Sequence, residues 1–277
     1  MIDPTEKRRL LDAVALIARD AARAILEVYG TDFTVTLKDD RSPLTEADKR
    51  AHTIIQAGLR ALDAAIPVLS EEAAPEQSSE RRSWQRYWLV DPLDGTKEFL
   101  KRNGEFTVNI ALVIGHRAEL GVVLAPALGR LYFGAVGLGA WRQDGDELPE
   151  PIYVERIAKA PLRVVGSRSH ETGALADYLA ALGPHTVTPM GSSLKICLIA
   201  EGAADLYPRL GPTSEWDTAA AQAILESAGG RMIDSSGQPL RYNSKDDLLN
   251  PHFFAFGDQR RDWLAPIQSS RGRQDRN

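Results

Sequence analysis

The segment WLVDPLDGTKEF, residues 88–99, places two carboxylates at the point where an apolar run ends. Asp91 and Asp94 are separated by a proline and a leucine, and Gly95 and Thr96 follow at once. Aspartate, proline and glycine favour turns, so turn formation alone explains part of this pattern. Carboxylates at the end of a core strand are nevertheless costly unless a positive species neutralises them. The segment predicts a buried strand that ends in a turn, and it leaves open whether the turn is structural or binds a cation.

Other acidic residues also stand at the ends of predicted elements, and each has a structural explanation. Glu71 follows the apolar segment PVLS, and with its glutamate neighbour it is typical of an exposed face. Asp217 precedes TAAAQAILESAGG and is a good helix N-cap. Asp48 lies three residues after Thr45, which matches a capping box. Thr96 itself is a candidate cap for a helix that begins at KEF.

The combination of these residues favours a metal site. Hard divalent cations such as Mg²⁺ take oxygen ligands from carboxylates, water and substrate phosphates. Asp91, the Leu93 carbonyl and Asp94 can present three oxygens from one turn, and the N–H groups of Gly95 and Thr96 can face a phosphate at a helix start. Two ions about 3.5–4 Å apart can activate a water and stabilise the leaving oxygen in phosphoryl transfer. A pair of metal ions is the simplest neutralising species.

The composition of the 277 residues limits the class of protein. Charged residues make up 26% and the net charge is −5, with lysines and arginines scattered rather than gathered in a basic stripe, which disfavours a nucleic-acid binder. The one cysteine, Cys197, excludes an internal disulfide framework and is expected to be a core thiol in a reducing compartment. The N-terminal residues do not resemble a signal peptide, and we find no apolar stretch of membrane-spanning length. A cytoplasmic protein is expected.

The hydrophobic pattern changes along the chain. Helical spacing predicts a long amphipathic helix from near Pro4 to Gly30 and a second from Thr45 to about Ala65. Residues 106–145 contain strand-like runs broken by glycine-containing turns, which favour antiparallel strands. After about residue 160, strand and helix patterns alternate, as in α/β proteins. The expected organisation is an N-terminal α+β domain (1–160) with most metal ligands, a C-terminal α/β domain (161–265) with Asp217 and the substrate contacts, and a disordered tail (266–277).

WLVDPLDGTKEF together with GPTSEWDTAAAQAILESAGG resembles the two signatures of the inositol monophosphatase superfamily, which contains lithium-sensitive, Mg²⁺-dependent phosphatases. The resemblance extends from SPLTEAD through LSEE to the final AGG, nearly the whole chain. It implies a layered αβαβα sandwich of the sugar phosphatase type. It also implies two or three Mg²⁺ ions in each active site, with inhibition by Li⁺ or Ca²⁺.

Within the superfamily, the sequence is most similar to the CysQ-type 3'(2'),5'-bisphosphate nucleotidases. Inositol phosphatases typically have Gly-Thr-Thr-Asn-Phe where this chain has GTKEF, and the segments KRNGEFTVNIALV and GSSLKICLIAEG also resemble the nucleotidase branch. The resemblance implies hydrolysis of the 3'-phosphate of 3'-phosphoadenosine 5'-phosphate (PAP) to AMP in sulfur assimilation, with its sulfated analogue PAPS as a further substrate that would yield APS. The alternative in the same superfamily is an inositol monophosphatase or a related sugar phosphatase.

The resemblance also implies roles for individual residues. The first metal would be held by Glu71, Asp91 and the Leu93 carbonyl, and the second by Asp91, Asp94 and Asp217. Thr96, polarised by Asp48, would orient or deprotonate the attacking water. The substrate contacts would be Glu71, Leu93, Asp94, Gly95, Thr96, His170, Ser192, Lys195, Arg209 and Asp217.

Several alternatives stay open at this point. A lone lysine such as Lys195 is usually a solvated surface residue, and Trp216 is expected to pack rather than to contact a base. A member of the superfamily could instead act as an RNA- or polymerase-associated factor, although the intact acids and the acidic net charge disfavour this. The expected partner is a small nucleotide, without nucleic acid or a transmembrane segment. The oligomeric state is expected to be a monomer or a homodimer, and peripheral association with the cytoplasmic face of the inner membrane stays open.

Overall fold

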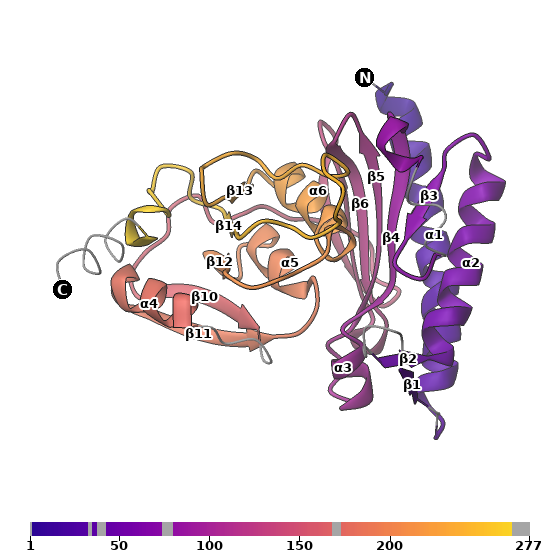
Figure 1. Ribbon diagram of the computed structural model, residues 1–277, viewed down its shortest axis with the longest axis horizontal. Helices are drawn as coiled ribbons and strands as arrows, with labels where there is room; N and C mark the ends of the chain where they lie inside the picture. Colours follow the sequence, from indigo (N-terminus) through magenta and orange to yellow (C-terminus); the bar gives the residue numbers. More distant parts are fainter. Residues whose placement is uncertain (1, 33–34, 38–42, 74–79, 168–172, 268–277) are drawn as a thin grey trace.

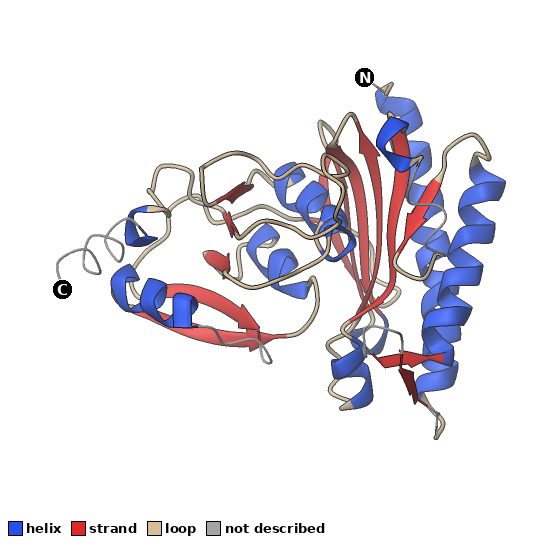
Figure 2. Cartoon of the chain, viewed as in Figure 1, coloured by secondary structure: helices blue, strands red, loops and turns tan. Residues whose placement is uncertain are grey.

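The computed structural model describes residues 2–32, 35–37, 43–73, 80–167 and 173–267. Two large β-sheets and three groups of helices alternate in layers, as the ribbon and the secondary-structure colouring both show (Figures 1 and 2). This arrangement is the predicted αβαβα sandwich. Among the described residues, no helix combines the length and apolar character needed to cross a membrane.

The outer helical layer consists of α1 (Pro4–Tyr29) and α2 (Glu46–Leu62), which cover one face of the larger sheet (Figure 1). Helix α1 begins where Asp3 Oδ1 accepts the backbone N–H of Thr5 at 2.8 Å, and it ends at Gly30 as predicted. Helix α2 ends three residues earlier than expected. Asp63 adopts an extended backbone, and its side chain accepts the N–H of Ala65 at 2.9 Å, so the chain turns toward the sheet.

The larger sheet has seven strands in sequence order. Strand β3 pairs with β4 in parallel, and all later neighbours pair antiparallel, which confirms the prediction for residues 106–145. The strands are β3 (Val68–Ser70), β4 (Arg86–Asp94), β5 (Thr107–Ile114), β6 (Arg117–Ala125), β7 (Arg130–Ala135), β8 (Gly139–Asp144) and β9 (Glu150–Pro151). A two-stranded sheet of β1 (Val35–Leu37) and β2 (Pro43–Thr45) precedes it, and short helices η2 (Arg81–Ser83), α3 (Thr96–Leu100) and η3 (Pro126–Leu128) lie between strands.

The middle layer consists of α5 (Leu194–Ala200) and α6 (Ala219–Ser227), packed between the two sheets (Figure 1). Its buried side chains belong to one hydrophobic cluster with residues of both sheets, such as Val123 from β6 and Phe253 from β14. Helix α5 ends at Ala200. The chain reverses at Gly202, whose φ of +74° is unfavourable for other residues and whose Cβ position lies 3.0 Å from the Tyr153 carbonyl oxygen.

The smaller sheet has five strands in the order β11, β10, β12, β14, β13, with β10–β11 and β10–β12 parallel. The strands are β10 (Leu162–Ser167), β11 (His185–Met190), β12 (Leu206–Arg209), β13 (Arg231–Asp234) and β14 (Phe253–Phe256). Helix α4 (Gly173–Leu182) forms the last layer, because its Tyr178 and Leu182 share a cluster with Val164 of β10 and Phe254 of β14.

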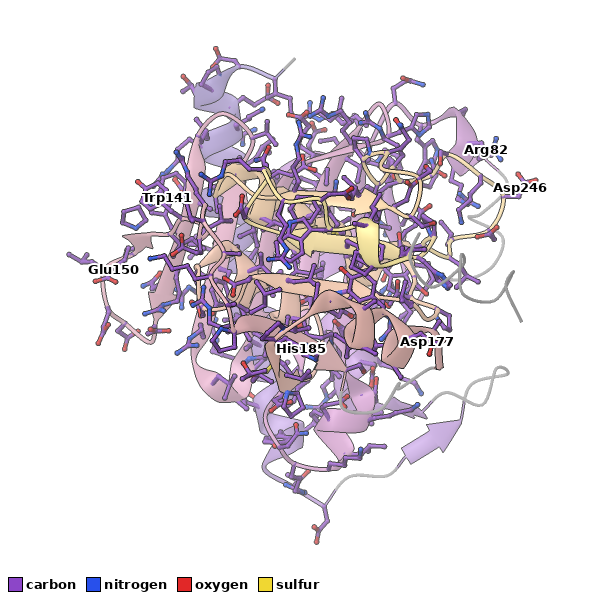
Figure 3. All side chains as sticks on the ribbon, turned by 90° about the vertical axis from the view of Figure 1, so that its left-hand side faces the viewer. Arg82, Trp141, Glu150, Asp177, His185 and Asp246 are labelled. Atoms are coloured by element: carbon purple, nitrogen blue, oxygen red, sulfur yellow. The ribbon has the colours of Figure 1, made fainter. Side chains whose placement is uncertain are left out.

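In the side view of Figure 3, Trp141 of β8 and Glu150 of β9 lie at the left, and His185 of β11 and Asp177 of α4 lie on the side that faces the viewer. In the same view Arg82 and Asp246 lie side by side, and they form an ion pair between segments distant in sequence. Ile267 packs partly against the cluster of the smaller sheet. Residues 268–277 of the predicted tail lie outside the described residues. The division of the chain into two domains stays a prediction.

Candidate active site

The strand that carries Asp91 does not stop at Val90, as the apolar run suggested, but continues irregularly to Asp94. Asp91 pairs with Asn109 of β5 and Asp94 with Thr107, so β4 uses one residue more than its partner over this stretch. In a regular strand, residues three apart point to opposite faces. The extra residue is a β-bulge, which turns the strand so that both aspartates reach the same pocket.

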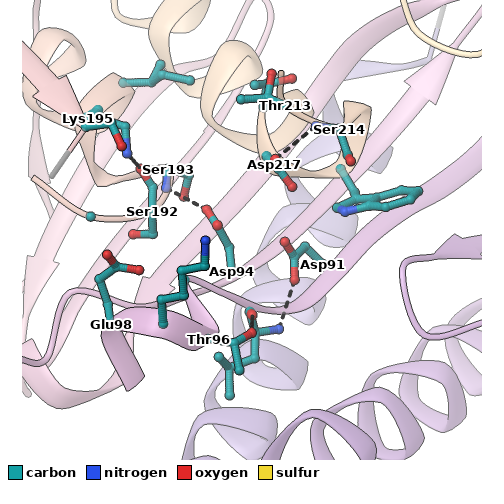
Figure 4. Close-up of a pocket in the computed structure, with 18 of the residues that line it drawn as sticks. Asp91, Asp94, Thr96, Glu98, Ser192, Ser193, Lys195, Thr213, Ser214 and Asp217 are labelled. Atoms are coloured by element: carbon teal, nitrogen blue, oxygen red, sulfur yellow. Dashed lines mark hydrogen bonds between the residues drawn. The ribbon is translucent and has the colours of Figure 1, made fainter. Parts of the chain in front are cut away.

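The carboxylates of Asp91, Asp94 and Asp217 form a compact cluster at this bulge. Their oxygens lie within 4.8 Å of one another, and Figure 4 shows the three side chains pointing toward a common point. Burial, and then the negative charge of Glu71, raises the pKa of Asp91 well above its usual range. Burial also raises the pKa of Asp94 to about 6, although Lys195 opposes this rise.

The donor set of this cluster fits a hard divalent cation. Burial and the charge of Asp94 raise the pKa of Asp217, so all three aspartates resist ionisation when no cation compensates them. Glu71 and Leu93 line the same pocket, and the Glu71 carboxylate and the Leu93 carbonyl are further candidate oxygen ligands. Carboxylate and carbonyl oxygens are the ligands that Mg²⁺ prefers. The assignment of individual residues as metal ligands stays a prediction.

Asp94 is held by residues from both halves of the chain. Its Oδ2 accepts the backbone N–H of Ser193 at 2.7 Å and the Asn109 side-chain amide at 3.4 Å. The Ser193 hydroxyl in turn donates to Asn109 Oδ1 at 2.8 Å and lies 3.0 Å from the Thr107 hydroxyl. Sequence reasoning missed Asn109 and the contact of Ser193 with Asp94, because both depend on the pairing of segments distant in sequence.

Asp217 does not cap α6, so that prediction is wrong. It ends the short helix η4 (Glu215–Asp217), and its Oδ2 accepts the N–H of Ser214 at 2.9 Å in a capping box (Figure 4). Thr218 then occupies the N-cap position of α6. The extra turn moves Asp217 ahead of the helix and into the pocket, where its carboxylate meets those from β4.

Gly95 is the N-cap of α3, and Thr96 is the first residue of that helix, so Thr96 does not act as the cap. Gly95 has a φ of +89°, and a Cβ there would lie 3.2 Å from the Glu105 carbonyl oxygen, which explains why glycine stands at this position. The Thr96 hydroxyl donates to the Leu93 carbonyl oxygen at 3.4 Å, a long hydrogen bond that leaves the group close to the acidic cluster (Figure 4).

Asp48 is buried at the start of α2, and the predicted capping box is present. Its Oδ2 accepts the Thr45 N–H at 2.8 Å and the Thr45 hydroxyl at 2.6 Å. Asp48 is not among the described residues that line the pocket of the acidic cluster. Its pairing with Thr96 in catalysis therefore stays a prediction.

Two buried cations lie beside the acidic cluster. Lys195 is only 7% exposed, so it is not the solvated surface residue that a lone lysine usually is. Its Nζ donates to the carbonyls of Ser192 at 2.6 Å and Met190 at 3.3 Å, and burial lowers its pKa to about 8. Arg209 is 8% exposed and donates to the Pro212 carbonyl at 2.5 Å. Within the described part of the chain, its Nε has no hydrogen-bond partner.

A cavity of about 300 Å³ joins these groups. It brings together most of the predicted site residues: Glu71, Asp91, Leu93, Asp94, Gly95, Thr96, Ser192, Lys195, Arg209 and Asp217. His170, the remaining predicted contact, lies outside the described residues. Glu98, Tyr207 and Trp216 also line the cavity, and Trp216 packs against the core as well, as expected. Glu98 follows the predicted phosphate contacts Gly95 and Thr96 in the GTKEF segment, so its closeness in sequence could have predicted that it lines the cavity.

The chain belongs to the inositol monophosphatase family, whose model matches residues 6–266. Among its relatives, the 3'(2'),5'-bisphosphate nucleotidase CysQ of Escherichia coli K12 is 52% identical over 246 residues, which cover 88% of this chain and 98% of that protein. The enzyme of the same name from Buchnera aphidicola is 43% identical over 252 residues, which cover 90% and 94%.

A solved structure supports the same grouping. The crystal structure of CysQ from Bacteroides thetaiotaomicron, a bacterial member of the inositol monophosphatase family, aligns with a TM-score of 0.79 at 42% identity. The alignment covers 90% of this chain and 97% of that one. The predicted family and fold are therefore confirmed.

Proposed function

We propose that this chain is a 3'(2'),5'-bisphosphate nucleotidase, which hydrolyses the 3'-phosphate of PAP to give AMP and phosphate, with PAPS as a further substrate. The observation that carries this proposal is a single cavity in which three clustered aspartates stand beside two buried cations, Lys195 and Arg209. A bisphosphorylated nucleotide needs both features: a metal-binding cluster for the phosphate that leaves and fixed positive charge for the phosphate that stays. The identity with curated nucleotidases of this name supports the same activity.

Magnesium is the metal we propose, in two or three ions. Asp91, Asp94, Asp217, Glu71 and the Leu93 carbonyl would hold it. When bound, the metal would supply Lewis-acid stabilisation of the phosphate and lower the pKa of water. The backbone of Gly95 and Thr96 would bind the scissile phosphate, since both residues line the cavity next to Asp94.

The protein's own residues would position the reacting groups. The contacts of Asp94 with Ser193 and Asn109 fix its carboxylate before substrate arrives, and such preorganisation favours the transition state. The Thr96 hydroxyl would orient the attacking water, and Asp48 would assist it. The hydrogen bond from the Thr96 hydroxyl to the Leu93 carbonyl is long, and it is weak enough to be exchanged for a hydrogen bond to water.

The second phosphate would be bound at Arg209, Lys195 and Ser192. Two of the three N–H groups of Lys195 are engaged by backbone carbonyls, so Lys195 can offer one donor and its charge. Arg209 lines the same cavity, and a guanidinium can bind phosphate in a bidentate manner. We also retain the predictions of a cytoplasmic location and a monomeric or homodimeric state.

The experiment that tests the metal site compares Asp217→Asn with Asp146→Asn. Asp146 is an exposed aspartate outside the cavity, so its variant controls for the loss of one charge. Phosphate release from PAP should be lost in Asp217→Asn and in the wild type with a chelator, and should be unchanged in Asp146→Asn. Wild-type release that persists in chelator would contradict the proposed role of the metal.

A further inference from the structure

A second cavity, of about 360 Å³, lies at the other end of α6 and collects arginines. Arg117 at the start of β6, Arg231 at the start of β13 and Arg241 beyond β13 all line it. Most ion pairs of the protein join an arginine to a carboxylate, yet no ion pair or side-chain hydrogen bond involves these three guanidinium groups among the residues that the structure describes.

Backbone pairing explains why arginines from three segments meet. The N–H of Tyr242 donates to the His116 carbonyl at 3.1 Å, and His116 Nδ1 donates to the Tyr242 carbonyl at 2.8 Å. These contacts bring together Arg117, which follows His116, and Arg241, which precedes Tyr242. The Leu240 N–H donates to the Met232 carbonyl at 3.4 Å, which places the neighbouring Arg231 beside the same segment.

The wall of the cavity on α6 is held by hydrogen bonds and carries one negative charge, that of Glu226. Gln222 is buried, and its Oε1 accepts the hydroxyl of the buried Tyr242. Its Nε2 donates to Glu226 Oε1 at 2.7 Å, which holds in place the one carboxylate in the lining. The lining therefore combines three exposed arginines with one carboxylate, so positive charge is in excess around the cavity.

Unpaired like charges gathered in one hollow repel one another, and the repulsion is relieved when an anion is bound between them. A guanidinium matches the planar oxygens of phosphate and sulfate groups especially well. We propose that this cavity is a binding site for a compact oxyanion, such as the phosphate or sulfate group of a small metabolite, separate from the catalytic cavity. The site is independent of the proposed function, because no residue of the acidic cluster lines it.

The test measures the binding of inorganic pyrophosphate to metal-free protein by titration calorimetry. The variant R117Q/R231Q/R241Q removes the three charges of the cavity. The control variant R9Q/R60Q/R156Q removes three charges from exposed arginines that do not line it, so the net charge of the two variants is equal. Exposed substitutions of this kind should leave the melting temperature nearly unchanged, and the single variants R117Q, R231Q and R241Q serve if the triple variant does not fold.

We expect wild type and control to bind pyrophosphate with similar affinity and the cavity variant to bind at least about 10-fold more weakly, as the loss of charge-assisted hydrogen bonds requires. Each single variant should lose part of this affinity. Equal binding by the cavity variant and the wild type, equal loss in both triple variants, or no binding by the wild type would each overturn the proposal. If the cavity variant bound as tightly as the wild type, pyrophosphate would be assigned to the catalytic cavity. If both triple variants lost the same affinity, the effect would be assigned to net charge.

Discussion

Replacing Asp94 by asparagine should stabilise the metal-free protein at neutral pH, although the same change removes a proposed metal ligand. Burial raises the pKa of Asp94 from 3.8 to about 6, so its ionised form is disfavoured in the folded state. A rise of this size corresponds to at most about 3 kcal/mol of unfolding free energy at pH 7.5. Asparagine lacks the charge but keeps an oxygen that can accept the Ser193 N–H.

The net gain should be smaller than this limit. The asparagine side chain replaces one carboxylate oxygen by an NH2 group, and burying this group without a full set of hydrogen-bond partners costs about 1 kcal/mol or more. We therefore expect Asp94→Asn to raise the unfolding free energy by about 1–2 kcal/mol, or the melting temperature by about 2–6 °C. A carboxyl group with a raised folded-state pKa destabilises the protein above that pKa, and the penalty fades as the pH falls through about 6 toward 4. The gain should therefore disappear near pH 4.

Urea unfolding in chelator at pH 7.5 and pH 4.5 measures this difference, with Asp146→Asn as the control for an exposed charge. Added Mg²⁺ at pH 7.5 should reverse the order, because it stabilises the wild type more than the variant. The reasoning is refuted if Asp94→Asn is less stable than the wild type in chelator at pH 7.5, or if its gain is the same at both pH values.

Thr96→Ala should lower the turnover number at least about 10-fold while metal affinity, measured by calorimetry, stays within about 2-fold, because the hydroxyl is assigned to water and not to metal. Asp48→Asn should do the same, and the double variant should be much less than additive; a change in stability alone would reduce Asp48 to the helix cap of α2. Lys195→Met should lower kcat/KM for PAP by about 10- to 150-fold and affect inositol 1-phosphate less, since the second phosphate loses a charge-assisted contact. Equal losses for both substrates would instead assign Lys195 to the support of the Ser192 backbone.

The sequence predicted the elements whose residues carry a clear local signal. Helix α1 has a capping aspartate, a proline and regular apolar spacing, and it extends from Pro4 to Tyr29 as expected. The capping box of Thr45 and Asp48 also forms. The order of the acidic motifs was sufficient to identify the family, because several independent segments agree with it.

The remaining features depend on contacts between distant segments. The bulge that turns Asp94 into the pocket arises from the pairing of β4 with β5, which no single segment specifies. The burial of Lys195 depends on the carbonyls of its own loop and on the ring of Tyr207, whose centroid is 5.5 Å away. Asp217 lies in the pocket because a short helix precedes α6, and its sequence fitted a helix cap equally well.

The central claim is that this chain hydrolyses a bisphosphorylated nucleotide. The most direct measurement compares kcat/KM for PAP and for inositol 1-phosphate with purified wild-type protein in Mg²⁺, scored by phosphate release. We predict a clear preference for PAP, with AMP and phosphate formed in equal amounts. A preference for inositol 1-phosphate, or no phosphate release from PAP by folded protein that has bound metal, would contradict the claim.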